Sequence, residues 1–209
     1  MKRFIYLFII VIMIVSCGVK TKNVKVVERK LPIENFVDTF LINHSNLYQN
    51  DVIYNDVNKI FVKEIINKLQ NDNIIYGLPL QLEDINRVGD NNVVHFGSWI
   101  EPDGWEYKGK LDNVYVDIIA YVNDSLMHKL QNDEYYTFVG KFIKSIEIDE
   151  ARNLIGKNIR AYNNIISIGK EKNDPFYKEK VDVNLGIMYF KVDSIFDFNG
   201  RQNDSIIIK

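Results

Sequence analysis

The 209-residue chain contains one cysteine, Cys17, with only four prolines and three histidines. A single cysteine excludes a disulfide within the chain and the paired thiolates of a structural zinc site. His44, His95 and His128 are scattered, without His-x-x-x-His or Glu-x-x-His spacing, so zinc ligation lacks a local signature. Glycine-rich phosphate loops and serine-nucleophile elbows are also absent from the sequence. We therefore expect neither a metal nor a cofactor.

The chain also has no excess of positive charge. The chain has 26 basic and 28 acidic residues, a formal net charge of -2, which falls to -4 once residues 1–16 are left out. Nucleic-acid binding depends on a broad positive surface that neutralises phosphates. The charge balance therefore argues against a nucleic-acid partner. The hydrophobic content of 46% predicts a packed core rather than a disordered chain.

The longest hydrophobic run is Phe4–Val15, which follows Lys2 and Arg3. A helix needs about 20 apolar residues to cross the hydrocarbon core, so this run is too short to span comfortably. A short positive stretch followed by an apolar run of this length is typical of a secretory signal. We predict that residues 1–16 are a signal peptide.

The apolar run ends in Ile14-Val15-Ser16-Cys17, which resembles the lipobox of bacterial lipoproteins. The resemblance implies that a diacylglycerol is joined to the Cys17 sulfur and that cleavage precedes this residue. Two acyl chains hold a protein at a bilayer much more firmly than one. Gly18 is not the aspartate that resembles an inner-membrane retention signal, which favours the outer membrane. The alternatives are an ordinary secretory signal with a chance cysteine, or an uncleaved anchor.

After the lipobox the sequence divides into three parts. Residues 17–31 are polar and basic and are interpreted as a lipidated flexible tether. Residues 32–77 carry two amphipathic helices, the first beginning at Pro32 and the second after Asn50. Their apolar stripes are Ile33, Phe36, Val37, Phe40 and Leu41 in the first helix, and Val57, Phe61, Ile65 and Leu69 in the second. Residues 78–209 are rich in β patterns, and we expect both parts to form one unit.

The β-rich part alternates strands and turns. Strands are predicted near 80–88, 93–100, 114–122, 135–146, 165–168 and 181–192, with a hairpin from 195–198 through Asn199-Gly200 to 205–208. Val114, Val116, Ile118, Ala120 and Val122 are expected on one face of their strand. A short helix capped by Asp124 or Ser125 and a bend at Gly140 are also predicted.

The strand, strand, strand, short helix, strand order, and above all the stretch Leu130–Ile146, resembles the oligonucleotide/oligosaccharide-binding fold. The resemblance covers residues 78–146, with a closing strand at 181–192, and implies a small five-stranded barrel. The interval 148–180 departs from that fold. We predict an α+β protein with two N-terminal helices packed on an antiparallel, OB-like small β-barrel.

An aromatic group surrounds the Pro102-Asp103-Gly104 turn and forms the main candidate binding site. It consists of Trp99, Trp105 and Tyr107, with both tryptophans of the chain inside seven residues. Exposed aromatic rings can stack on sugars or on apolar groups of a partner. The alternative is structural, because cross-strand aromatic pairs also hold a hairpin in register.

Three functional classes follow. The leading hypothesis is a lipid-anchored, non-catalytic envelope module that binds a protein or glycan partner. A second is an envelope hydrolase whose carboxylates come together on folding from Glu101, Asp103, Asp112 and Asp117. A third is a structural or assembly subunit of an envelope complex. No catalytic residue is assigned, because Asp124, Ser125 and His128 are spaced for helix capping rather than for a triad.

Overall fold

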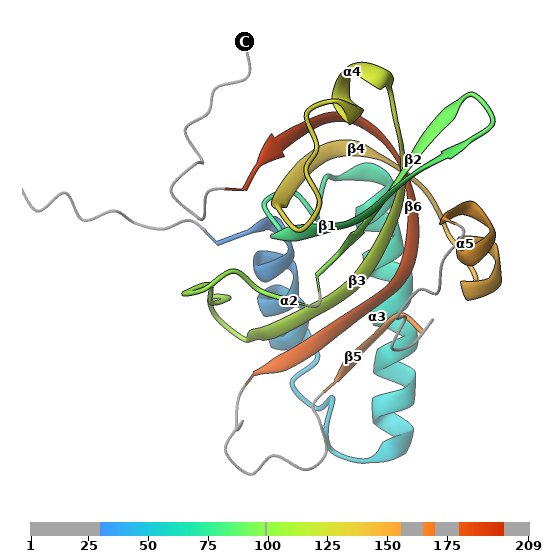
Figure 1. The fold of residues 1–209 in the computed structure, drawn as a ribbon. Coiled ribbons are helices and arrows are strands. Elements are labelled where there is room, and N and C mark those ends of the chain that lie inside the picture. The colour runs from blue at the N-terminus through green and yellow to red at the C-terminus, as the bar shows by residue number, and fades with distance from the viewer. Residues whose placement is uncertain (1–29, 99, 156–164, 170–179, 199–209) are drawn as a thin grey trace, which may run out of the picture.

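The computed structural model describes residues 30–98, 100–155, 165–169 and 180–198. The predicted signal peptide, Cys17, most of the tether, Trp99 and the predicted hairpin turn beyond Phe198 lie outside the described residues. Within the described part the chain forms four helices and a six-stranded sheet (Figure 1). The predicted α+β class is confirmed at this level.

Two helices precede the sheet: α2 (Pro32–Asn43) and α3 (Asp51–Asn71). α2 begins with a proline, whose missing N–H would have had no helical partner in the first turn. α3 begins after Asn50, whose side chain accepts a hydrogen bond from the Ile53 N–H at 2.9 Å. The predicted apolar stripe of α3 is its buried face, formed by Val57, Phe61, Ile65 and Leu69. Both predicted helices are confirmed.

The remaining elements alternate as the sequence pattern predicts, with shifted ends. The strands are β1 (Leu80–Val88), β2 (Asn91–Gly97), β3 (Leu111–Val122), β4 (Tyr135–Ser145), β5 (Ser167–Gly169) and β6 (Val181–Asp197). The short helices are α4 (Asp124–Met127) and α5 (Ile148–Ile155). The main difference is β6, which is 17 residues long and includes Ile195, so the predicted separate strand at 195–198 largely belongs to it.

The strands follow the order β3-β2-β1-β4-β6-β5, and β3 also pairs with β6. Every pairing is antiparallel except β3–β6, which is parallel and places Ala120 level with Phe190. The prediction of an antiparallel sheet is therefore wrong for this one pair. A parallel pair requires a long crossover connection, and the chain between β3 and β6 supplies one that includes α4, β4 and α5.

β4 bends at Gly140, as predicted. Its register with β6 shifts between Val139 and Gly140. A Cβ added to Gly140 would come within 2.6 Å of the Lys191 carbonyl oxygen. The missing side chain therefore lets β6 pass close to β4 at the bend.

The sheet buries apolar side chains on both faces. The larger core joins the helices to one face of β3, formed by the predicted set Val114, Val116, Ile118, Ala120 and Val122. A smaller cluster lies on the other face and includes Ile119 of β3 with Ala151 and Ile155 of α5. α5 is therefore the cover of the second face, while α2 and α3 lie on the opposite side of the sheet (Figure 1).

The cap of α4 differs from the prediction. Asn123 caps this helix, because its side chain accepts the Leu126 N–H at 2.8 Å. Asp124, one of the two predicted caps, instead accepts a hydrogen bond from the Asn92 side chain at 2.6 Å. None of the described helices is both long and apolar enough to cross a membrane.

Candidate functional site

The loop that carries Trp105 is fastened to α2 by two carboxylates. Glu34 is completely buried, and its two oxygens accept the backbone N–H groups of Leu31 and Lys108. One turn further along α2, Asp38 accepts the Lys110 N–H at 2.7 Å. The loop before β3 is thus fixed by backbone hydrogen bonds to charged acceptors, which are stronger than neutral ones.

The predicted aromatic group is only partly a surface feature. Tyr107 is 2% exposed and belongs to the core, so its ring does not face solvent. Trp105 is half-buried and stands edge-on to Tyr107, with ring centroids 5.6 Å apart. Trp99 lies outside the described residues. Of the three predicted residues, Trp105 is the one that the structure shows to be half-buried rather than buried.

The neighbours of Trp105 come from distant parts of the chain. Its ring lies edge-on to Phe198, with centroids 5.1 Å apart. The Phe198 N–H donates to the Tyr135 carbonyl at 2.8 Å, which places these two residues opposite each other across β6 and β4. Phe196 is two residues before Phe198 and is directed to the same side. We call these four half-buried residues the aromatic face: Trp105, Tyr135, Phe196 and Phe198.

Acidic groups lie beside the aromatic face. The pKa of Tyr135 is raised, first by burial and then by the negative charges of Asp103 and Glu83. Asp103, one of the predicted hydrolase carboxylates, therefore lies on the exposed turn near Tyr135 and not in the acidic cluster described next. The local sequence pattern does not indicate the other three residues of this face, because the pairing of β4 with the end of β6 gathers them at one end of the sheet, where Phe198 contacts Trp105.

A carboxylate cluster forms where β3 and β6 begin. It contains Glu101, Asp112 and Asp182, and the first two are among the predicted hydrolase carboxylates. The pKa of Glu101 is raised by burial and then by the Asp112 charge, against the opposing effect of Lys180. Burial also raises the pKa of Asp182, although its hydrogen bond from Asn113 at 2.8 Å counteracts the shift. The two groups therefore hold their protons to a higher pH than ordinary carboxyls.

Asp117, the fourth predicted carboxylate, lies elsewhere. It is 1% exposed on β3, and its Oδ1 lies 2.7 Å from Nε2 of His95 on β2, which is 7% exposed. The two side chains lie on the face of the sheet opposite the main core, because their neighbours Val116 and Phe96 point into it. His95 is therefore a buried histidine in contact with a carboxylate inside the sheet.

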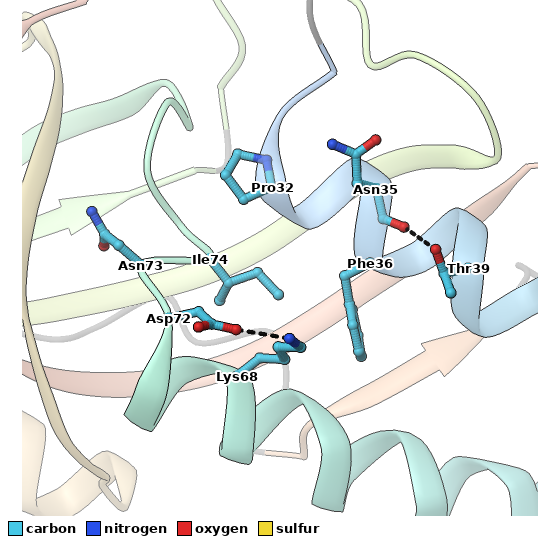
Figure 2. Close-up of a pocket in the computed structure, with 8 residues that line it drawn as sticks. All are labelled: Pro32, Asn35, Phe36, Thr39, Lys68, Asp72, Asn73 and Ile74. Carbon is cyan, nitrogen blue, oxygen red and sulfur yellow. Dashed lines mark hydrogen bonds and ion pairs between the residues drawn. The ribbon is translucent and has the colours of Figure 1, made fainter.

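Two clefts complete the candidate surfaces. One, of about 460 Å³, lies between α4 and the ends of β4 and β6 and is lined by Leu126, Lys129, Leu130, Tyr136, Ile195, Phe196 and Asp197. The other, of about 500 Å³, lies between α2 and the segment where α3 ends (Figure 2). The first cleft borders the aromatic face, because Phe196 lines it.

Neither a metal site nor a relative points to a function. Among the described residues, no group of three or more histidine, aspartate or glutamate side chains could hold a metal ion. Comparison of the chain with protein-family models, curated proteins and solved structures found no match.

Proposed function

We propose that this protein is a lipid-anchored cell-envelope protein whose folded domain is a non-catalytic binding module for a protein or glycan partner. The aromatic face carries the proposal. Four aromatic side chains are gathered at one end of the sheet without being fully buried. Large aromatic rings supply much of the free energy of recognition when a partner covers them.

The strand pairings support an OB-like barrel as the scaffold of this module. The contacts run β1-β2-β3-β6-β4 and return to β1, so five strands form a closed circuit. α4 lies between β3 and β4 in the chain, as the single helix does in the resemblance drawn from residues 78–146. β5, α5 and the two N-terminal helices are additions to that plan. A closed barrel gives its rim a rigid support for binding side chains.

The proposed anchor is the diacylglyceryl group on Cys17, and the outer membrane is the favoured location. Its support is the sequence alone: Lys2, Arg3, the apolar run and Ile14-Val15-Ser16-Cys17. The first described residue is Lys30, so 12 residues separate Cys17 from the described domain. Twelve extended residues reach about 40 Å, enough for the domain to turn its aromatic face away from the bilayer.

The face itself favours a neutral or basic partner rather than nucleic acid. Asp103 and Glu83 act on Tyr135, and Asp197 ends β6 beside Phe196. These carboxylates would repel phosphates, whereas sugar hydroxyls and basic protein side chains can donate hydrogen bonds to them.

The proposal is tested by removing rings from the aromatic face. We expect the Trp105→Ala, Phe198→Ala double variant to lose capture of its partner from detergent-solubilised envelopes by about 30-fold or more, since two central rings are removed. Its Tm should fall by only a few degrees, because the rings are half-buried. Quantitative mass spectrometry of the captured material and a thermal melt measure the two effects.

A matched control is Tyr189→Ala, which removes a ring paired with Tyr121 at 5.1 Å in the smaller cluster. This variant should capture the same partner as the unaltered protein. If the double variant captures the partner normally, or if its Tm falls by tens of degrees, the aromatic face is structural and the proposal fails.

A second candidate function, an envelope hydrolase, is favoured by one observation. Glu101 and Asp182 both have raised pKa values and share Asp112 as a neighbour. A carboxyl with a raised pKa keeps its proton to a higher pH, and a general acid must hold a proton in order to donate it. Activity would therefore be present at low pH and lost as the pH rises through that pKa.

This second candidate predicts hydrolysis of an envelope glycan or peptide that falls at least about 100-fold in Glu101→Gln and in Asp182→Asn. Asp103→Asn, an exposed carboxylate outside the cluster, should leave the rate unchanged. Assays from pH 4 to 8 on purified envelope polymers would decide the question. If the Glu101 and Asp182 variants hydrolysed the polymer at the same rate as the Asp103 variant, the hydrolase candidate would be excluded.

A further inference from the structure

The last part of β6 has one edge that β3 does not cover. Tyr189 pairs with β3 on one edge of β6 and with β4 on the other. The pairing with β3 ends at Lys191, whereas the pairing with β4 continues to Asp197. Among the residues that the structure describes, no strand therefore pairs with the β3 side of β6 from Val192 to Asp197. We call this stretch the open edge.

The open edge presents backbone groups that a strand can bind. The Phe198 N–H donates to the Tyr135 carbonyl in β4, so these two residues belong to a hydrogen-bonded pair. Along an antiparallel ladder such pairs alternate with pairs whose backbone groups point away from the partner strand. Ile195 and Asp197 occupy the alternate positions. Their N–H and C=O groups therefore point to the open edge, and another strand can satisfy them by extending the sheet.

An apolar cleft runs along this edge. It is the cleft of about 460 Å³ between α4 and the end of β6, at the end of the sheet where α4 lies (Figure 1). Leu126 and Leu130 line it from the α4 side and Ile195 lines it from β6, and all three are half-buried. A strand added about 4.8 Å from β6 would direct every second side chain to the same face. The cleft therefore suits apolar side chains at alternate positions of that strand.

The charges beside the open edge favour a basic segment. Asp193 and Asp197 lie near its two ends and are exposed. Of the side chains that line the cleft, Asp197 is negative and Lys129 is positive. Asp103 and Glu83 add negative charge at the neighbouring aromatic face. Basic side chains of a partner would be attracted to this surface and acidic ones repelled.

The same features weigh against occupants from the protein itself. A two-residue turn at Asn199-Gly200 would return the chain along the open edge only if Phe198 directed its backbone groups there, because the residues that flank such a turn bond to each other. The Phe198 N–H is instead donated to β4. Two copies that paired through their open edges would bring the aspartates of both copies together.

We propose that the open edge of β6 binds an extended segment of a partner protein in which basic residues alternate with apolar ones. The inference rests on the proposed binding function and deepens it, because it makes the partner a protein and names the segment that binds. Hydrogen bonds to the backbone of Ile195 and Asp197 supply affinity, the cleft selects the apolar side chains, and the aspartates select the basic ones. The site borders the aromatic face at Phe196, which lines the same cleft.

The test is isothermal titration calorimetry of the full mature chain with the capped peptide Lys-Val-Lys-Ile-Lys-Val-Lys-Ile-Lys. We expect this peptide to bind at least about ten-fold more tightly than the form in which glutamate replaces every lysine. Two N-methylated forms, one methylated at the apolar residues and one at the lysines, each remove the N–H groups from one edge of the peptide. Strand addition predicts that one form loses binding and the other keeps it. Loss of binding in both forms, or in neither, overturns the proposal.

Two exposed positions test the protein side of the contact. Lys129→Trp fills the cleft and also makes its lining more negative, so the expected loss of binding comes from the filled space and not from charge. Asp197→Lys should weaken binding about ten-fold. The matched control is Asp90→Lys in the turn between β1 and β2, which changes the net charge equally and should bind normally. Binding that survives Lys129→Trp, or equal weakening by the two lysine variants, contradicts strand addition at this edge.

The outcomes separate this inference from the proposed function. The Trp105→Ala, Phe198→Ala variant should lose capture of the envelope partner and still bind the peptide. If the unaltered protein does not bind the peptide, the open edge is not the site, while capture through the aromatic face stands. If the peptide binds only after the isoleucines at 206–208 are replaced by serine, the chain's own end occupies the edge and the proposal is overturned.

Discussion

Replacing Glu34 by alanine is expected to lower the free energy of unfolding by about 3–5 kcal/mol. The carboxylate is completely buried and accepts two backbone N–H groups, one from Leu31 before α2 and one from Lys108 in the loop before β3. Alanine would remove the acceptor of a buried N–H at Leu31 and of a partly buried N–H at Lys108. At about 2–4 °C per kcal/mol for a domain of this size, the Tm should fall by about 10 °C.

Urea unfolding followed by circular dichroism measures this change. Glu34→Gln should lie between the two proteins, because its single carbonyl oxygen can accept one of the two donors well. The matched control is Glu64→Ala on α3, where the carboxylate is exposed and the cost should be below about 0.5 kcal/mol. A loss below about 1 kcal/mol for Glu34→Ala would show that the loop is not held by this residue.

The second large effect is expected at Asp117. Asp117→Ala removes the partner that lies 2.7 Å from the buried His95 ring, and the expected cost is about 3 kcal/mol. The loss should exceed that of Asp103→Ala, an exposed aspartate on the turn near Trp105, by a wide margin. Thermal melts of the two variants measure the difference.

A double variant tests whether the loss of stability comes from leaving one member of the pair without its partner. Replacing both members of the pair, as His95→Leu with Asp117→Leu, removes the unpaired polar group and should recover much of the lost stability. If the double variant is instead as unstable as the sum of two single leucine variants, the contact between the two side chains contributes little.

Local patterns predicted the elements of this fold well. The i, i+4 spacing from Val57 to Leu69 matches the buried face of α3, and the period of two from Val114 to Val122 matches the core side of β3. Gly140 also marked the bend of β4. These features depend on neighbours within one element, so the local sequence pattern is enough to predict them.

Features that depend on distant segments were missed. The parallel β3–β6 pair joins two strands that are separated in the chain by four elements: α4, β4, α5 and β5. Asp182 had no local signature, and only that pairing brings it to Glu101 and Asp112. Tyr107 shows the opposite case, since it was grouped with Trp105 by sequence proximity but is buried in the core. Short-range spacing predicts the type of element and the face on which a residue lies. Long-range strand pairing decides which residues from different segments come into contact.

The proposal of a membrane-tethered module is tested most directly by intact-mass spectrometry of the protein purified from its native envelope. The account predicts a chain that begins at Cys17, lacks residues 1–16, and carries the added mass of a thioether-linked diacylglycerol on that residue. A chain that retains its leader, or one with a free thiol at position 17, would contradict the lipid anchor and the envelope location that depends on it.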